Sequence, residues 1–322
     1  MNSTLETYAE DQASDPQPQY TWPESELYIS EKHRLIYCPI QKVACSSLKL
    51  WWAELAEGSS AQFLQTDHRG KKWVDHFTLN ERYKLLHYQP ANQTLQPLTD
   101  EAWFRIVFVR NPWARLVSAY LNKFLLCDDI IMPVFNEAQL RWGHLDLSSI
   151  PKRIRRLFSW NKKAEEEFLR LSIWPRLYGK KAWQDEFTFR HFVEFIAASD
   201  LEGDDIDLHW RPQYRFLGDV KFHFVGRFEQ LDTDFRTLVE RLGLHSELPA
   251  FNRTTYKRQK RSGPSFADCP LKQIRRLTKA PDYRQFYTPR LQAQVADLYR
   301  RDIEQFGYEF DEWREEVVNT AA

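Results

Sequence analysis

Two side chains suited to one phosphate follow an apolar run in the middle of the chain. Positions 104 to 120 read Phe-Arg-Ile-Val-Phe-Val-Arg-Asn-Pro-Trp-Ala-Arg-Leu-Val-Ser-Ala-Tyr. The run predicts a strand that is covered on both faces, and Asn111 and Pro112 suit the cap and first position of a helix. Arg110 would then stand at the carboxyl end of the strand, with Ser118 about two turns along the helix. A guanidinium fork and a hydroxyl suit a terminal phosphate, and a carboxylate partner for the arginine is the alternative.

A second segment repeats this order of strand, loop and helix. Residues 34–49 read Arg-Leu-Ile-Tyr-Cys-Pro-Ile-Gln-Lys-Val-Ala-Cys-Ser-Ser-Leu-Lys. Lys42 supplies a cation, and the small residues after it let backbone N–H groups approach an anion at a helix N-terminus. The segment has no Gly-Lys-Ser/Thr, and no glycine lies between residues 38 and 57. It is therefore not the glycine-rich loop of nucleoside triphosphatases.

The two segments together resemble the two signatures of sulfotransferases that use 3′-phosphoadenosine-5′-phosphosulfate (PAPS). The likeness is greatest to the Golgi carbohydrate sulfotransferases of the chondroitin 4-O and HNK-1 group, which is sulfotransferase family 2. Further blocks in a compatible order lie at residues 209–215, 224–229 and 298–308, so that the resemblance spans about residues 33–310. Gln41 departs from the family pattern, which has other residues around the proline.

This resemblance implies where the cofactor binds. The loop of residues 38–49 would hold the 5′-phosphosulfate, and the strand and helix of residues 104–124 would hold the 3′-phosphate. A late basic segment usually closes over the adenosine 3′-phosphate, which here is the stretch with five Lys or Arg at 253–261; a plain mobile loop is the alternative. The implied cofactor-binding residues are Lys42, Val43, Ala44, Cys45, Ser46, Ser47, Arg110, Ser118, Arg253 and Arg258.

The chemistry implied is the in-line transfer of SO₃ to an acceptor hydroxyl, much as in phosphoryl transfer. Lys42 would neutralise the charge that grows on the leaving 5′-phosphate, with Arg115 as a further helper or the partner of an acidic neighbour. No metal ion is required. The second product would be 3′,5′-adenosine bisphosphate.

Attack by a hydroxyl needs a general base, and histidine suits that task near neutral pH. In related glycan 2-O-sulfotransferases the base lies between the two phosphate signatures, which leaves His68, His76 and His87 here. We select His76, because it stands beside Asp75 and an apolar residue and precedes a helix expected at residue 79. His209 is expected to be a structural or acceptor-side residue.

The elements that position these groups alternate along the chain. We expect strands at 34–40, 104–109 and 221–225, and helices at about 46–57, 112–126, 187–198, 235–244 and 289–305. This order predicts an α/β fold with a mostly parallel sheet flanked by helices, similar to P-loop NTPases, with ligands at the carboxyl ends of the strands. Residues 26–315 would form a single sulfotransferase domain, between a flexible tail or arm at 1–25 and a C-terminal tail at 316–322.

The amino-acid composition indicates which classes of binding partner to expect. The 45 basic and 45 acidic residues balance, which gives no support for nucleic-acid binding. Residues 151–181 nevertheless hold ten Lys or Arg against three Glu, within a region of about 127–185 that we interpret as an acceptor-side insertion; a solvated helical face is an equal alternative. The region contains tryptophans that could stack on sugars, whereas Trp51 and Trp52 are expected in the core. Those tryptophans are Trp142, Trp160, Trp174 and Trp183.

The acceptor implied by the resemblance is a carbohydrate, as a polysaccharide or glycolipid. A small-molecule acceptor, a nucleotide-binding module without catalysis and an ATP-dependent phosphotransferase are the alternatives. Peripheral membrane contact and the oligomeric state stay open.

The first twenty-odd residues are polar and lack the apolar run of a signal peptide, and no later stretch approaches about 18 apolar residues. Together with Met1, this leads us to expect a soluble, cytoplasmic, bacterial relative; the Golgi lumen would apply to an anchored protein trimmed before residue 1. The four cysteines, at 38, 45, 127 and 269, are too few for a disulfide scaffold and are expected to be free thiols.

Overall fold

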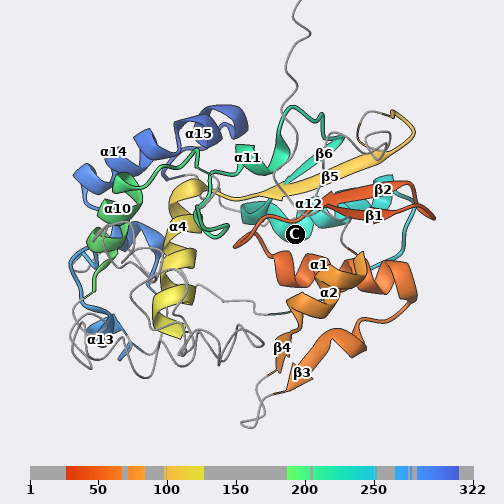
Figure 1. Cartoon of the computed structure of the whole chain (residues 1–322), viewed down its shortest axis with the longest axis horizontal. Helices are drawn as coiled ribbons and strands as arrows, with labels where there is room; N and C mark the ends of the chain where they lie inside the picture. Colours follow the sequence, from red (N-terminus) through yellow and green to blue (C-terminus); the bar gives the residue numbers. More distant parts are fainter. Residues whose placement is uncertain are drawn as a thin grey trace, which may run out of the picture.

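A four-stranded sheet carries the two predicted phosphate segments side by side. The computed structural model describes residues 27–66, 72–83, 98, 100–126, 187–203, 206–249, 251, 265–274, 276–277 and 281–311. Within these ranges the strand order is β1-β2-β5-β6, with β2, β5 and β6 parallel and β1 antiparallel at the edge (Figure 1). The strands are β1 (Tyr28–Ser30), β2 (Leu35–Cys38), β5 (Phe104–Val109) and β6 (Phe224–Arg227). The predicted α/β class and mostly parallel sheet are confirmed.

The helices agree with the predicted order, with four main differences in extent. The helix expected at 235–244 begins earlier and spans Leu231–Arg241. The helix after Pro112 changes to a π-helix over Leu121–Leu126. The last predicted helix divides at Tyr299, whose hydroxyl donates to the carbonyl of Trp210 at 2.6 Å. The helix expected at residue 79 already begins at His76. The helices are α1 (Cys45–Glu57), α2 (His76–Tyr83), α4 (Pro112–Tyr120), α10 (Phe189–Ala198), α11 (Tyr214–Leu217), α12 (Leu231–Arg241), α13 (Leu271–Ile274), α14 (Pro289–Leu298) and α15 (Arg300–Phe306).

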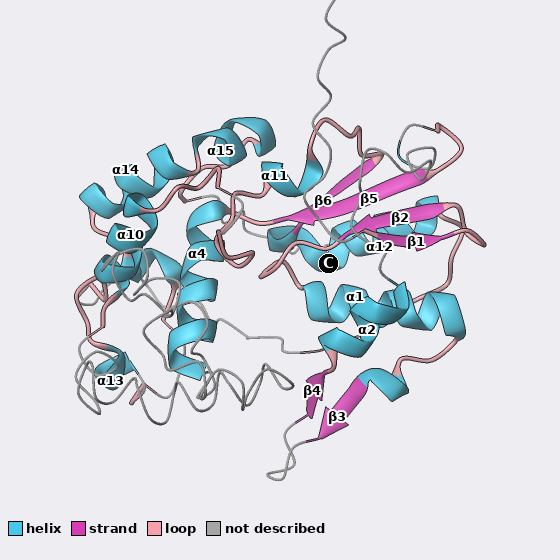
Figure 2. Ribbon diagram, in the orientation of Figure 1, coloured by secondary structure: helices cyan, strands magenta, loops and turns pink. Residues whose placement is uncertain are grey.

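Short elements complete the described structure. A separate two-stranded antiparallel sheet pairs β3 (Leu64–Thr66) with β4 (Lys72–Val74) beneath α1 and α2 (Figure 2). Three 3-10 turns lie at Ala61–Phe63, Phe228–Gln230 and Tyr283–Phe286. Among the helices in these ranges, none combines the length and the hydrophobicity that a bilayer span needs.

Aromatic side chains bind α1 to the sheet. Trp51 and Trp52 are fully buried, and their rings meet edge to face with centroids 6.2 Å apart. Trp51 also packs against Phe235 of α12 at 5.2 Å, and Trp52 against Tyr37 of β2 at 6.1 Å. The prediction that this tryptophan pair belongs to the core is confirmed. The pair fixes the helix whose N-terminus forms part of the site.

Helix α4 is held by a second hydrophobic core. Tyr120 at its end lies among Phe189 and Phe192 of α10 and Phe286, with ring centroids 5.4 to 6.1 Å apart. Trp113 in its first turn packs on Phe310 at 5.6 Å. At its start, Asn111 caps the helix by accepting from the N–H of Ala114 at 3.2 Å, and Pro112 follows as predicted. The helix is therefore fixed at both ends.

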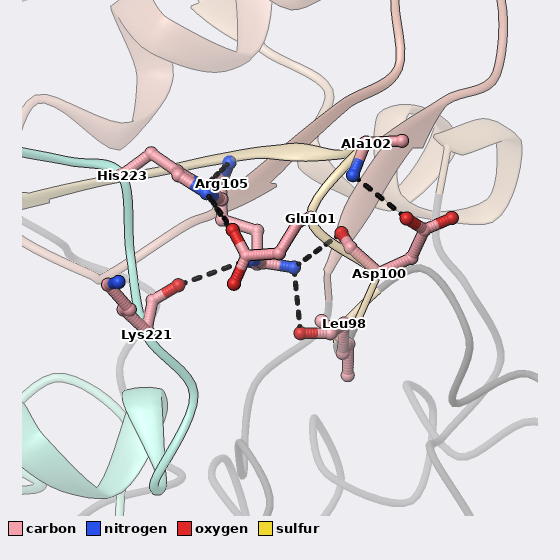
Figure 3. A network of polar contacts seen from close by, with 7 residues as sticks. All are labelled: Leu98, Asp100, Glu101, Ala102, Arg105, Lys221 and His223. Carbon is pink, nitrogen blue, oxygen red and sulfur yellow. Dashed lines mark hydrogen bonds and ion pairs between the residues drawn. The ribbon is translucent and has the colours of Figure 1, made fainter.

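A buried arginine secures the opposite end of β5 (Figure 3). Arg105 donates to the carbonyls of Leu98 at 2.9 Å and Asp100 at 3.0 Å, and to that of Lys221 at 2.9 Å. Its backbone N–H donates to His223 Nδ1 at 3.0 Å, and its carbonyl accepts from His223 N at 2.8 Å. Because the 221–223 stretch is held by these contacts, β6 begins at Phe224 and not at residue 221 as predicted.

Of the four cysteines, three lie in the described residues. Cys38, Cys45 and Cys269 form no disulfide among the described residues, and Cys38 is buried with its thiol donating to the carbonyl of Phe216 at 3.3 Å. Cys127 lies outside the described residues, as do the predicted insertion at 127–185, its four tryptophans and both predicted tails.

Candidate functional site

The two predicted phosphate segments meet at the carboxyl edge of the sheet. Strands β2 and β5 are parallel neighbours, with Cys38 opposite Val107, so the residues that follow them emerge at the same edge. Arg110, directly after β5, donates from Nη1 to the carbonyl oxygen of Lys42 at 2.9 Å. One guanidinium thus joins the end of β5 to the loop that follows β2.

The loop after β2 has the backbone of an anion-binding site. Lys42 and Ala44 both have left-handed backbone conformations, with φ of 67° and 50°. In residues with a Cβ each such conformation costs about 1–2 kcal/mol, and it curls successive N–H groups into a concave nest. Ala44 is also the N-cap of α1, and having no polar side chain it leaves the first N–H groups of that helix without a side-chain cap. These donors and the helix dipole favour an anion in front of Cys45 and Ser46.

The two serines of this loop have different partners. Ser46 Oγ lies 3.1 Å from His76 Nε2. Ser47 Oγ donates to the carbonyl of Phe251 at 3.2 Å, and the N–H of Phe251 lies 3.3 Å from the same oxygen. The Ser47 hydroxyl therefore holds the chain two residues before Arg253. Arg253 and Arg258 themselves lie outside the described residues.

The guanidinium of Arg110 is buried, and within the part of the chain that the structure describes no ion pair neutralises it. It lies 4.0 Å above the ring of Phe228, and its Nε is buried without a hydrogen-bond partner among the described residues. The nearby carboxylate of Glu229 instead accepts from the N–H of Asn111 at 2.9 Å and from the hydroxyl of Tyr308 at 3.1 Å. Burial raises the pKa of Glu229 despite the opposing effect of Arg110. Among the residues that the structure describes, no carboxylate forms an ion pair with Arg110, and the carboxylate alternative stays untested for the rest of the chain.

Ser118 is the residue of α4 that keeps an accessible side chain. The other eight residues of the helix, from Pro112 to Tyr120, are buried, while Ser118 is half-buried. Its accessible position is consistent with ligand contact. In the described structure, no hydrogen bond joins Ser118 to Arg110.

Arg115 has a structural role that the sequence did not predict. It is buried, and it donates to three backbone carbonyls: Gln41 at 3.0 Å, Arg211 at 2.8 Å and Leu208 at 3.0 Å. It therefore ties the loop before Lys42 to the 207–211 segment. These hydrogen bonds to the backbone give Arg115 that structural role, and its predicted roles as a phosphate helper or the partner of an acidic side chain stay untested.

Two histidines from distant segments share this site. Burial lowers the pKa of His76 to about 4, assisted by repulsion from Lys49, His209 and Lys42 and opposed by Asp75. Burial also lowers the pKa of His209 to about 4, and the hydrogen bond to Asp207 opposes this shift. Both imidazoles are therefore neutral near pH 7. His68 and His87, the other candidates for the base, lie outside the described residues.

The sequence interpretation missed two members of this site. Asp207 lies 2.7 Å from His209 Nδ1, and the Asp-x-His spacing of these residues was a signal that could have identified the pair. Lys49 is almost fully buried, donates to Asn80 Oδ1 at 2.8 Å and raises the positive potential around His76. Nothing local in the sequence distinguishes Lys49 from an exposed helical lysine.

Comparison with known proteins gives the class of protein first. The family model described as "Sulfotransferase family" matches residues 25–309, which is most of the chain. The chain therefore belongs to the sulfotransferase family.

The curated relatives are more specific. Over 232 residues the chain is 29% identical to carbohydrate sulfotransferase 14 of Homo sapiens, covering 70% of this chain and 49% of that protein. It is 27% identical to carbohydrate sulfotransferase 14 of Danio rerio over 72% of this chain and 52% of the relative. With carbohydrate sulfotransferase 12 of Mus musculus, identity is 24% over 95% of this chain and 65% of the relative.

The chain thus spans about half to two thirds of the length of the curated relatives it matches. These relatives come from vertebrates, and they give no support to the expectation of a bacterial, cytoplasmic protein. No solved structure matches the chain.

Proposed function

We propose that the protein transfers a sulfuryl group from PAPS to a hydroxyl of a carbohydrate. The observation that carries this proposal is the contact between Arg110 and the Lys42 carbonyl, which joins two anion-binding segments at one sheet edge. PAPS has two anionic centres, the 5′-phosphosulfate and the 3′-phosphate, and each segment suits one of them. The relatives that match this chain are named carbohydrate sulfotransferases, which supports a sugar as the acceptor.

The described residues fit such a donor. The loop of residues 42–47 combines a nest with an uncapped helix N-terminus, which suits the phosphosulfate. Nε of Arg110 is a buried donor that finds no acceptor among the described residues and could bind a phosphate oxygen, and Ser118 lies on the accessible face of the adjoining helix. We propose Arg253 as a third contributor to phosphate binding, because Ser47 holds Phe251 beside the donor loop. Arg258 is proposed with it from the resemblance alone.

Each catalytic task has a candidate residue. When bound, PAPS supplies the activated sulfuryl group and a phosphate leaving group. Lys42 neutralises the charge that grows on the leaving 5′-phosphate as the sulfur–oxygen bond breaks. His76 takes the proton of the acceptor hydroxyl while the new sulfur–oxygen bond forms, because its neutral ring is already in contact with Ser46 of the donor loop.

Two other classes of function would require different groups at this site. An ATP-dependent phosphotransferase needs magnesium, and a regulatory nucleotide-binding module needs no base. A small-molecule acceptor in place of a sugar also remains an alternative. The likeness to the P-loop NTPase fold stays a prediction.

Thermal shift and transfer assays test the proposal together. Stabilisation by 3′,5′-adenosine bisphosphate without magnesium is expected, and stabilisation by Mg-ATP alone would overturn the proposal. Labelled sulfate from PAPS should then appear on members of a panel of glycans and glycolipid extracts. Binding of the bisphosphate without transfer to any acceptor would favour the regulatory module.

A further inference from the structure

A second histidine of the site is held in one tautomer. His209 Nδ1 lies 2.7 Å from Asp207 Oδ1, which also accepts the backbone N–H of His209 at 2.7 Å. Although burial opposes it, the hydrogen bond from His209 lowers the pKa of Asp207, so the carboxylate is ionised near neutral pH. An ionised carboxylate can only accept, so the proton of the neutral ring is on Nδ1. Nε2 of His209 is consequently a hydrogen-bond acceptor.

The segment that carries this pair is rigidly held. The N–H groups of Trp210 and Arg211 donate to the Asp207 carbonyl at 3.1 and 2.9 Å. The carbonyl of Trp210 accepts from the Tyr299 hydroxyl at 2.6 Å. Arg115 holds the carbonyls on both sides of this position, at residues 208 and 211. A side chain on so constrained a backbone is well suited to hold a ligand in one orientation.

The same contacts place His209 next to the donor loop. The guanidinium of Arg115 that bonds to the carbonyl before His209 also bonds to the carbonyl of Gln41, the residue before Lys42. Lys42, and His209 in its protonated form, both lower the pKa of His76. With the Arg115 bridge between the carbonyls of residues 41 and 208, this indicates that both imidazoles lie on the donor-loop side of the site. His76 contacts that loop directly through Ser46, whereas His209 reaches it through the Arg115 bridge.

We propose that His209 binds a second hydroxyl of the acceptor, next to the hydroxyl that His76 deprotonates. The attacking oxygen belongs beside His76, because that ring touches the loop proposed to hold the phosphosulfate. Nε2 of His209 then accepts the hydrogen bond of a neighbouring hydroxyl, and Asp207 acts as a positioning residue that keeps Nε2 unprotonated. The inference rests on the proposed function and adds a specificity: the acceptor carries at least two adjacent hydroxyls.

Steady-state kinetics with the most active glycan of the panel test this role. His209→Gln and Asp207→Asn are expected to raise KM for the acceptor about three- to tenfold, with kcat within about twofold and an unchanged affinity for 3′,5′-adenosine bisphosphate. Monodeoxy versions of the glycan should show one position whose removal raises the wild-type KM but not that of His209→Gln. His191→Gln, on the exposed face of α10, is the matched control and should behave as wild type.

Two kinetic results would overturn the inference. If His209→Gln lowered kcat at unchanged KM, and if kcat of this variant no longer fell at low pH as that of the wild type does, His209 would be the base itself. Unchanged kinetics with every acceptor would leave His209 without a role in acceptor binding. In both cases the wild type still transfers sulfate, so the failure is distinct from a failure of the proposed function, in which the wild type transfers none.

The tautomer can be tested without any acceptor. Nitrogen-15 NMR of the histidine-labelled full chain, assigned with His209→Gln, is expected to show a protonated Nδ1 and an unprotonated Nε2 at neutral pH. Asp207→Asn should weaken that preference. A ring protonated on Nε2 in the wild type would overturn the inference whatever the transfer assays give.

Discussion

The ring of His76 and the hydroxyl of Ser46 lie 3.1 Å apart, which joins the first residue of α2 to the N-terminus of α1. The carboxylate beside this histidine has another task. Asp75 accepts from the N–H of Thr78 at 3.0 Å and from its hydroxyl at 2.8 Å, so it caps α2. The sequence argument for His76 cited the neighbouring Asp75; the structure gives a better one, because the imidazole itself touches the proposed donor loop.

Replacing His76 by alanine should remove turnover and leave donor binding intact. A positioned general base contributes about 10²- to 10⁴-fold, so kcat should fall by that order while the affinity for 3′,5′-adenosine bisphosphate changes little. Because the pKa of His76 is lowered to about 4, the basic form predominates throughout pH 5 to 8. The kcat/KM of the wild type should therefore not fall as the pH is lowered from 8 to 5. Full activity of His76→Ala would refute this choice of base.

The same lowered pKa values predict acid sensitivity of the fold. An unfolded histidine titrates near pH 6.5 whereas folded His76 and His209 titrate near 4, so the native state binds fewer protons between these values. The free energy of unfolding is then lost as pH falls from about 6.5 to 4, by about 3 kcal/mol for each histidine. Urea unfolding at several pH values should give a smaller loss for His209→Gln than for the wild type. An identical dependence would contradict the buried neutral state.

Replacing Lys42 and replacing Arg110 should impair sulfuryl transfer in different ways. Lys42→Ala is expected to abolish transfer with a modest change in donor affinity, because its charge is needed as the leaving phosphate forms. Arg110→Ala should abolish transfer mainly by weakening 3′,5′-adenosine bisphosphate about 10- to 100-fold, as expected for lost hydrogen bonds to a charged group. Arg110→Lys should not restore the affinity, since a lysine lacks the planar fork.

Calorimetric titration of the bisphosphate separates these two losses from each other. Arg290→Ala, at an exposed arginine of α14, is the control for a simple change in net charge. Equal affinity losses for Lys42→Ala and Arg110→Ala would contradict the division of roles.

The sequence predicted the positions of elements best where the physical cause of an element is local. The apolar run of 104–109 and the Asn111-Pro112 cap gave β5 and the start of α4 at their observed positions. The structural role of Arg115 was not predicted, because its three acceptors are backbone carbonyls of residues 41, 208 and 211, which no side-chain pattern encodes. The late start of β6 has the same origin, since it depends on contacts with Arg105, more than a hundred residues earlier in the chain.

Because Arg115 holds three distant carbonyls, it should be a major source of stability. Arg115→Met keeps most of the volume but leaves one buried and two part-buried carbonyls without their donor, at about 1–3 kcal/mol for a buried unsatisfied group before relaxation. We expect the free energy of unfolding to fall by about 3–5 kcal/mol, measured by urea titration. Arg290→Met is the matched control and should stay within about 0.5 kcal/mol of the wild type. A similarly small effect for Arg115→Met would mean that water replaces its contacts.

Gly226, in the Phe-Val-Gly-Arg block of β6, is required by close packing between neighbouring strands. It lies opposite Phe108 in the register, and a Cβ at this position would come within 2.3 Å of the Phe108 ring. Gly226→Ala should therefore destabilise the fold by about 1–3 kcal/mol through overpacking. Since Phe108 lies two residues before Arg110, the displaced ring should also weaken binding of 3′,5′-adenosine bisphosphate. Phe108→Val removes Cδ1, Cε1 and Cζ, the atoms that would clash, so in a double-mutant cycle Gly226→Ala should cost less in that background. An undiminished cost would place the cause in the backbone of β6 and not in this contact.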